Sequence, residues 1–76
     1  MPRTIKRSMK IAGHNTSISL EDAFWDALKD MAQAQNLSVA ELVREMDQKR
    51  LTLDESIGLS SAIRIFILEH YRTKAH

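Results

Sequence analysis

Residues 16–25 read TSISLEDAFW, and this stretch combines two different hydrophobic periods. In TSISL the apolar and polar side chains alternate, as they do along a strand with one buried face. After Leu20 the apolar spacing changes to three and four residues, which is the spacing of an amphipathic helix. The sequence therefore predicts a short strand followed directly by a helix. One strand cannot form a sheet alone, so a partner strand must come from this chain or from a second copy.

A weaker strand pattern lies immediately upstream. Arg7, Met9 and Ile11 fall on one face of residues 7–11, with the serine and lysine between them on the other. Residues 12–15 read AGHN and are a turn candidate, because glycine accepts positive φ and asparagine tolerates it. The two strand stretches could pair as a hairpin, or each could pair across a dimer axis.

Residues 21–35 carry the pattern of a first helix. Ser19 and Asp22 have the spacing of a capping box at its start, and Asn36 suits the left-handed residue that ends a helix. Trp25 lies at the edge of the apolar stripe, where a single tryptophan is more often core than a ligand anchor. The stripe itself consists of Phe24, Ala27, Leu28, Met31 and Ala32.

A second helix is predicted from Val39 to about Arg50. Residues 38–41 read SVAE, a capping box in which serine and glutamate each bond the other's backbone N–H. Residues 51–58 are predicted to connect to the next helix, with one helical turn after Thr52. The apolar stripe of this second helix is Val39, Leu42, Val43 and Met46.

A third helix is predicted over residues 59–73, where apolar side chains run nearly all the way round. Such a helix is buried by more than one neighbour, and in so small a chain we expect another subunit to be among them. Ser60 and Ser61 are interpreted as helix-capping residues. His70 is interpreted as a packing residue or a favourable charge near the C-terminal end.

The size of the chain favours one domain that associates with itself. Its 76 residues make a marginal monomer, and without cysteine no disulfide or thiolate metal site can reinforce it. We expect a basic N-terminal arm at residues 1–6 that frays, and a single domain at 7–76. No apolar run is long enough to cross a bilayer, so we expect no membrane partner and a reduced, cytoplasmic location.

Charge is unevenly distributed, although the net charge is only +1. Residues 1–14 carry Arg3, Lys6, Arg7 and Lys10 and no acidic residue, whereas residues 15–58 are acidic overall. A basic N-terminal segment on a mildly acidic body suits contact with a polyanion.

Catalytic and metal signals are weak. The chain offers no phosphate-binding loop and no nucleophile with a neighbouring base. His14, His70 and His76 do not share the spacing of a ligand set. We therefore expect no enzyme activity, no metal and no cofactor.

The order of strand, helix and capped helix resembles the ribbon-helix-helix class of DNA-binding proteins. The residues that carry the resemblance are TSISL at 16–20, FWDAL at 24–28 and NLSVAELV at 36–43. A longer pattern resembles a bacterial branch with an extra C-terminal helix. It adds KRS at 6–8, IAGH at 11–14 and LSSAIR at 59–64.

The resemblance implies a mostly α fold with a short β-ribbon, an intertwined homodimer and a third, C-terminal helix. In that class two ribbons pair antiparallel and enter the DNA major groove, which admits a two-stranded ribbon. The second helix binds phosphate through its N-terminus. Candidate DNA-binding residues are Lys6, Arg7, Ser8, Lys10, Asn15, Ser17, Ser19, Ser38 and Val39. Candidate dimer-core residues are Ile18, Leu20, Phe24, Leu28, Leu42, Val43, Met46, Ile63, Phe66 and Ile67.

The expected function is a DNA-binding transcriptional regulator of a bacterial cytoplasm that inserts an antiparallel β-ribbon, formed by two chains, into the major groove. Ser17 and Ser19 discriminate poorly between bases, and Asn15 can pair with adenine only if it lies on the strand. Lys6, Arg7 and Lys10 are therefore expected to supply the salt-dependent part of binding. The alternative is a protein-interaction module of the same fold, antitoxin-like, with little or no DNA binding.

Overall fold

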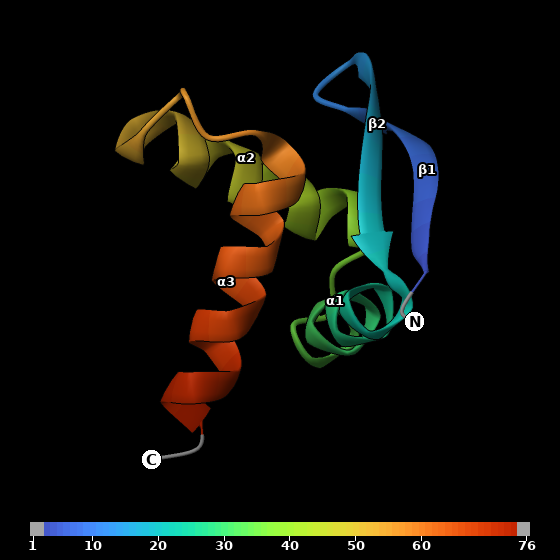
Figure 1. Cartoon of the computed structure of the whole chain (residues 1–76), viewed down its shortest axis with the longest axis vertical. Coiled ribbons are helices and arrows are strands. Elements are labelled where there is room, and N and C mark those ends of the chain that lie inside the picture. The colour runs from blue at the N-terminus through green and yellow to red at the C-terminus, as the bar shows by residue number, and fades with distance from the viewer. Residues whose placement is uncertain (1–2, 75–76) are drawn as a thin grey trace.

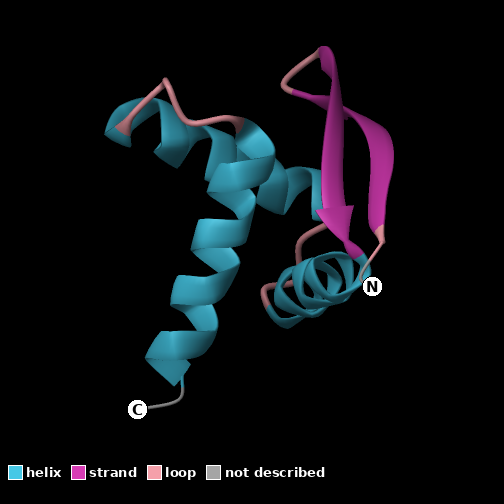
Figure 2. Cartoon of the chain, viewed as in Figure 1, coloured by secondary structure: helices cyan, strands magenta, loops and turns pink. Residues whose placement is uncertain are grey.

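A hairpin of two strands is followed by three helices in the computed structural model, which describes residues 3–74 (Figure 1). Figure 2 shows the hairpin standing beside the helices as the sole β-structure of the described chain. This order confirms the predicted mostly α fold with a β-ribbon and a third helix. The elements are β1 (Thr4–Ile11), β2 (His14–Glu21), α1 (Asp22–Ala34), α2 (Val39–Leu53) and α3 (Leu59–Lys74).

The partner of the predicted strand comes from the same chain, and not from the second chain that the resemblance implied. β1 and β2 pair antiparallel, with Ile11 opposite His14 across the turn. Ala12 and Gly13 form the two-residue turn with φ of 52° and 85°. Two consecutive positive φ values match the twist of a tight hairpin. Asn15 therefore lies on the strand and not in the turn, opposite Lys10.

β1 begins earlier than expected. Residues 1–6 were predicted to fray, but Thr4 to Lys6 belong to β1, and Thr4 pairs with Glu21. The prediction is wrong for these three residues, because β2 continues to Glu21 and offers them a partner. Residues 1 and 2 lie outside the described part of the chain.

The start of α1 differs from the predicted capping box. Its N-cap is Glu21, which makes no side-chain cap bond, because Ser19 is still within β2. The buried face of α1 also differs from the predicted apolar stripe, because it is centred nearer to Trp25 than to Phe24. Trp25 is 3% exposed, whereas Phe24 is only partly buried. Trp25 is drawn inward because its Nε1 donates to the Ile5 carbonyl of β1 at 2.9 Å.

The end of α1 follows the prediction. Asn36 adopts a left-handed φ of 57°. Its N–H donates to the Gln33 carbonyl, and the N–H of Leu37 donates to the Ala32 carbonyl. These two hydrogen bonds are the pattern of a Schellman motif. The chain then turns into α2.

Helix α2 has the predicted start but a later end. The capping box between Ser38 and Glu41 is present in both directions. The helix continues to Leu53, so residues 51–53 are helical where a connection was predicted. Thr52 does not begin a new turn, since its hydroxyl donates to the Lys49 carbonyl within the helix. The side chain of Asp54 instead accepts bonds from Ser56 just after it.

The core is built from the hairpin and all three helices. Its largest fully buried side chains are Ile18 and Leu20 of β2, Leu28 of α1, Val43 of α2 and Ile63 of α3. Burial of this kind contributes about 1.5–3 kcal/mol per side chain. No helix of residues 3–74 is long and apolar enough for a membrane span.

Candidate nucleic-acid interface

One side of the hairpin gathers six of the nine candidate DNA-binding residues. Residues directly opposite in an antiparallel pair project to the same face of a sheet. The register sets three such pairs side by side along the hairpin, and the Ser8 and Ser17 hydroxyls approach to 3.5 Å. We call this surface the polar face; its pairs are Lys6–Ser19, Ser8–Ser17 and Lys10–Asn15.

The opposite side of the hairpin explains why the polar face points to solvent. Ile11, Ile18 and Leu20 project from it and are at most 4% exposed, packed in the core with the helices. Because side chains alternate strictly along a strand, burying this set directs the polar set outward. The observed alternation confirms the predicted inward and outward positions of both strands.

The polar face divides its chemistry between the two strands. Lys6 and Lys10 are both on β1 and both exposed. Four residues along a strand separate them by about 13 Å. β2 contributes an amide at Asn15 and hydroxyls at Ser17 and Ser19. The face thus combines two cations with a row of small groups that both donate and accept hydrogen bonds.

Arg7 does not belong to the polar face. It faces the helices, with its guanidinium 5.3 Å from the centre of the Trp25 ring, an aromatic contact that arginine commonly makes. Arg7 was grouped with Lys6 and Lys10 as a source of positive charge, and the structure separates it from them. The alternation of residues 7–11 already placed Arg7 with Met9 and Ile11.

The base of the ribbon is held from two sides. On β1, Trp25 bonds the Ile5 carbonyl. On β2, Ser60 and Arg64 of α3 bond the backbone of Ser19. Sequence reasoning missed both, and it interpreted Ser60 as a capping residue. The available signal was the four-residue spacing of Ser60 and Arg64, which puts them on one face of a helix.

Arg64 also pairs with Glu21 at the junction of β2 and α1. Its Nε lies 2.9 Å from Glu21 Oε1. This hydrogen bond to the guanidinium is the main reason that the pKa of Glu21 lies below its ordinary value. The acid at the end of the ribbon is therefore matched by a cation from α3.

Ser38 and Val39 lie on a different element, at the start of α2. The backbone N–H of Ser38 donates to the Glu41 carboxylate, and this bond is the main reason that the pKa of Glu41 lies below its ordinary value. The Ser38 hydroxyl accepts from the backbone N–H of Glu41. The N–H of Ser38 is therefore occupied. Val39 and Ala40 retain first-turn N–H groups without an intrahelical acceptor, as every helix start does. The carboxylate of Glu41 competes there with any bound anion.

The candidate dimer-core residues mostly form the core of one protomer. Ile18, Leu20, Leu28, Val43 and Ile63 are fully buried within it. Three more of the set are at most 5% exposed: Leu42, Met46 and Ile67. Phe24 and Phe66 are only partly buried and keep surface for a further contact.

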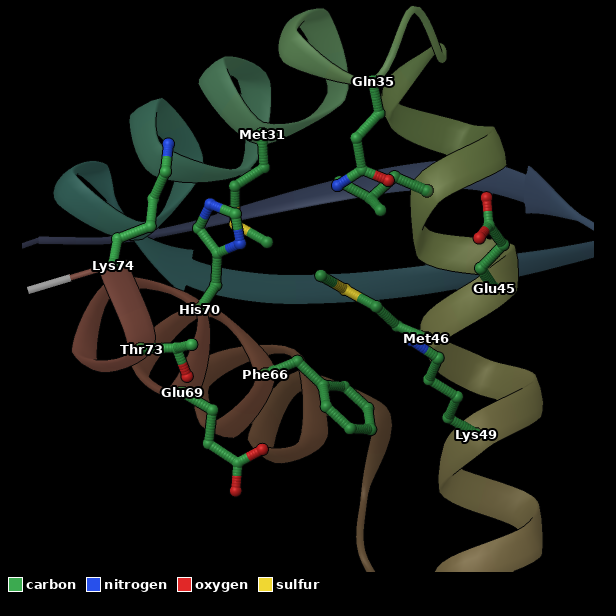
Figure 3. A pocket seen from close by; sticks show the side chains of 11 residues that line it. Met31, Gln35, Glu45, Met46, Lys49, Phe66, Glu69, His70, Thr73 and Lys74 are labelled. Atoms are coloured by element: carbon green, nitrogen blue, oxygen red, sulfur yellow. The ribbon is translucent and has the colours of Figure 1, made fainter. Parts of the chain in front are cut away.

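An open groove of about 360 Å³ lies among the three helices (Figure 3). Met46 of α2 and Phe66 of α3 approach each other on one side of it, and Met31 and His70 lie near each other on the other. Charged side chains form its rim, including Glu45, Lys49, Glu69 and Lys74. Mixed charge and wide access give this groove no defined ligand chemistry.

Comparison with known proteins agrees with this architecture. No curated protein matches the chain. A solved structure of an uncharacterized protein from Bordetella pertussis Tohama I is similar, with a TM-score of 0.82 and 27% sequence identity over 96% of this chain. The chain spans 59% of the length of that relative. The ribbon-helix-helix domain family matches residues 4–71, from the first strand through most of α3. The chain belongs to the ribbon-helix-helix domain family.

Proposed function

We propose that the protein is a DNA-binding transcriptional regulator of the bacterial cytoplasm, which acts as a homodimer and inserts a β-ribbon into the major groove. The observation that supports this proposal is the polar face: six exposed or half-exposed polar residues on one side of a two-stranded ribbon whose other side is anchored in the core. A ribbon of this width fits the major groove, where base edges can be read.

The chemistry of the polar face suits attraction and reading together. Lys6 and Lys10 can contact phosphates or the acceptor groups of guanine. Asn15 lies on the strand, so its amide can pair with adenine. Ser17 and Ser19 can bond several bases, so they support contact more than selectivity. Phosphate contact by the two lysines makes DNA binding weaken as salt increases.

The outer edge of β2 beyond Ser19, at Ser17 and Asn15, is the surface we assign to the second copy, because α3 of the same chain already bonds the edge at Ser19. The N–H and C=O of Ser19 point away from β1, to α3, and those of Ser17 and Asn15 point the same way because strand backbone groups alternate. This edge carries small uncharged residues. The edge of β1 carries Lys6, Arg7 and Lys10, and charged side chains, lysine above all, protect an edge from pairing. The two-fold symmetry of such a dimer predicts a palindromic or repeated site.

Fluorescence anisotropy of a labelled mixed-sequence duplex, titrated at several salt concentrations, tests DNA binding. We expect binding that weakens steeply with salt. The double variant Lys6→Ala/Lys10→Ala should bind less tightly and flatten the salt slope of the dimer by roughly four, two for each protomer. The control is Lys29→Ala/Lys49→Ala, which removes the same charge from exposed positions on α1 and α2. Absence of binding at low salt would refute the DNA proposal, and equal loss in both double variants would refute the role of the polar face.

A second candidate function has its own supporting observation. Five large apolar side chains are exposed on α2 and α3, from 41% for Tyr71 to 75% for Leu53. Such side chains suit a protein partner, as in antitoxins of this fold. Binding through them would change little with salt and would survive the loss of Lys6 and Lys10. Partner capture that behaves this way, with no DNA binding by the free protein, would favour the interaction module. The exposed set is Leu51, Leu53, Ile65, Leu68 and Tyr71.

A further inference from the structure

The first turns of α3 reach the edge of the ribbon. Ser60 and Arg64 are four residues apart and therefore lie on one face of the helix. The N–H of Ser19 donates to Ser60 Oγ at 3.1 Å, and Arg64 Nη2 donates to the Ser19 carbonyl at 3.0 Å. Both edge-facing backbone groups of one ribbon residue are thus bonded by α3, as a neighbouring strand would bond them.

Arg64 extends this contact to the end of the ribbon. Its Nε and Nη2 donate to the two carboxylate oxygens of Glu21, at 2.9 and 3.3 Å. The same guanidinium lies 6.0 Å from the centre of the Phe24 ring in α1. One side chain therefore connects α3, the last residue of β2 and the first turn of α1. A planar group with several donors is suited to this, and lysine could make only part of it.

The bonded residue is itself part of the polar face. Ser19 stands opposite Lys6 at the base of the ribbon. A bond to its backbone therefore determines where this part of the polar face stands relative to the helices. Trp25 provides the corresponding bond on β1, through the Ile5 carbonyl.

We propose that Ser60 and Arg64 are positioning residues that hold the ribbon in the geometry needed for the major groove. They act through the backbone of Ser19 and through Glu21, without touching DNA. This inference rests on the proposed DNA-binding function. A held ribbon binds more tightly because less freedom is lost on association. The positioning role also explains why the LSSAIR segment, residues 59–64, carries both a serine and an arginine, which helix capping alone does not explain.

Ser60→Ala and Arg64→Gln test the inference, with the exposed α3 residues Ser61→Ala and Arg72→Gln as matched controls. Amide hydrogen exchange measured by NMR reports directly on Ser19. Loss of one hydrogen bond should speed exchange of the Ser19 N–H by roughly fivefold in Ser60→Ala. Arg64→Gln removes the bonds to the Ser19 carbonyl and to the Glu21 carboxylate, so it should also speed exchange of the Ser19 N–H. Core amides such as that of Val43 should keep their exchange rates in all four variants.

DNA titrations of the same proteins separate positioning from contact. Ser60→Ala and Arg64→Gln should lower affinity severalfold with an unchanged salt slope, because no phosphate contact is lost. Ser60→Thr keeps the hydroxyl and should restore both Ser19 protection and affinity. A salt slope reduced by about two in the Arg64→Gln dimer, one for each protomer, would overturn the inference, since it would make Arg64 a phosphate ligand.

The exchange experiment also keeps this inference separate from the proposed function. If the wild-type protein binds no DNA, the DNA proposal fails while the exchange rates still decide whether α3 holds the ribbon. Unchanged Ser19 exchange in both Ser60→Ala and Arg64→Gln would overturn the positioning role, whatever the DNA result. Should Arg64→Gln fail to fold, the Ser60→Ala and Ser60→Thr pair is sufficient, because neither changes a charge.

Discussion

The two strands of the ribbon differ in charge, in anchoring and in the edge that they present. β1 carries Lys6 and Lys10 on the polar face and is anchored by Trp25 of α1. β2 carries only small polar groups on that face and is anchored by α3. Attraction to a polyanion therefore belongs to one strand, while the uncharged groups and the neutral edge belong to the other. Substitutions on β1 can therefore change the attraction to a polyanion, while substitutions on β2 change the uncharged polar groups.

The inner faces of the strands also differ, and the largest effect is expected there. Ile18 of β2 is fully buried, whereas Met9 of β1 is only partly buried. Ile18→Ala should lower the free energy of unfolding by about 2–5 kcal/mol, because it leaves a cavity in the core. Met9→Ala should lower it by clearly less. Urea unfolding of both variants checks this, and equal losses would contradict the view that β2 carries most of the packing.

The outer faces should differ in how they contribute to DNA binding. Ser17→Ala removes a hydroxyl from β2 without changing charge, so affinity should fall by about twofold to tenfold while the salt slope stays the same. Lys10→Ala on β1 should reduce the slope of the dimer by about two, one for each protomer. Anisotropy titrations over a salt series measure both. A reduced slope in Ser17→Ala would remove the distinction between the strands.

The anchor of β1 can be weakened without emptying the core. Trp25→Phe keeps an aromatic ring but removes the donor to the Ile5 carbonyl. Loss of this hydrogen bond should lower the free energy of unfolding by about 1 kcal/mol. The smaller ring and the altered contact with Arg7 should lower it further. Arg7→Gln serves as the companion variant, since it removes only that contact. Stability of Trp25→Phe equal to wild type would mean that the bond does not hold β1.

The turn that joins the strands should be open to improvement. Ala12 adopts a φ of 52°, which is unfavourable for alanine and tolerated by asparagine. Asn-Gly is the favoured pair for this turn. Ala12→Asn should raise the free energy of unfolding by roughly 0.5–1 kcal/mol, measured by thermal or urea unfolding. A decrease would show that the strand ends and not the turn residues set the turn geometry.

The anchor of β2 should give a small pH dependence of stability. The pKa of Glu21 is lowered mainly by its bond to Arg64, so the ionised form stabilises the fold above the ordinary value of 4.5. That stabilisation is lost as the pH falls through the lowered pKa. Glu21→Gln should therefore lose less stability than wild type on acidification. Glu41 and Asp54, whose pKa values are also lowered, remain in both proteins and serve as an internal reference.

Local signals in the sequence predicted the parts of the fold that depend on neighbouring residues. The capping box at Ser38, the left-handed Asn36 and the alternation of residues 16–20 all appear as expected. The polar face was predictable for the same reason, since alternation determines which side chains share a side.

Contacts between distant segments were not predictable in this way. Trp25 is buried in place of Phe24 because it meets a carbonyl twenty residues away. Ser60 bonds Ser19 across 41 residues. The spacing of Ser60 and Arg64 puts them on one face of a helix, but it does not tell which segment that face contacts. Helix α2 continues to Leu53 because the Thr52 hydroxyl donates to the Lys49 carbonyl and the Arg50 guanidinium donates to the Ile57 carbonyl. These features depend on which distant segments come into contact in the folded chain, and the hydrophobic periodicity of the sequence does not determine that.

The bond between Trp25 and Ile5 makes the protein its own fluorescent reporter. Trp25 is the single tryptophan of the chain, it is almost fully shielded from water, and its indole N–H is tied to the ribbon. If the ribbon leaves the helices, the indole meets water and its emission shifts to longer wavelength. Stopped-flow mixing with unlabelled DNA could then time any movement of the ribbon during binding, with no dye attached to either molecule.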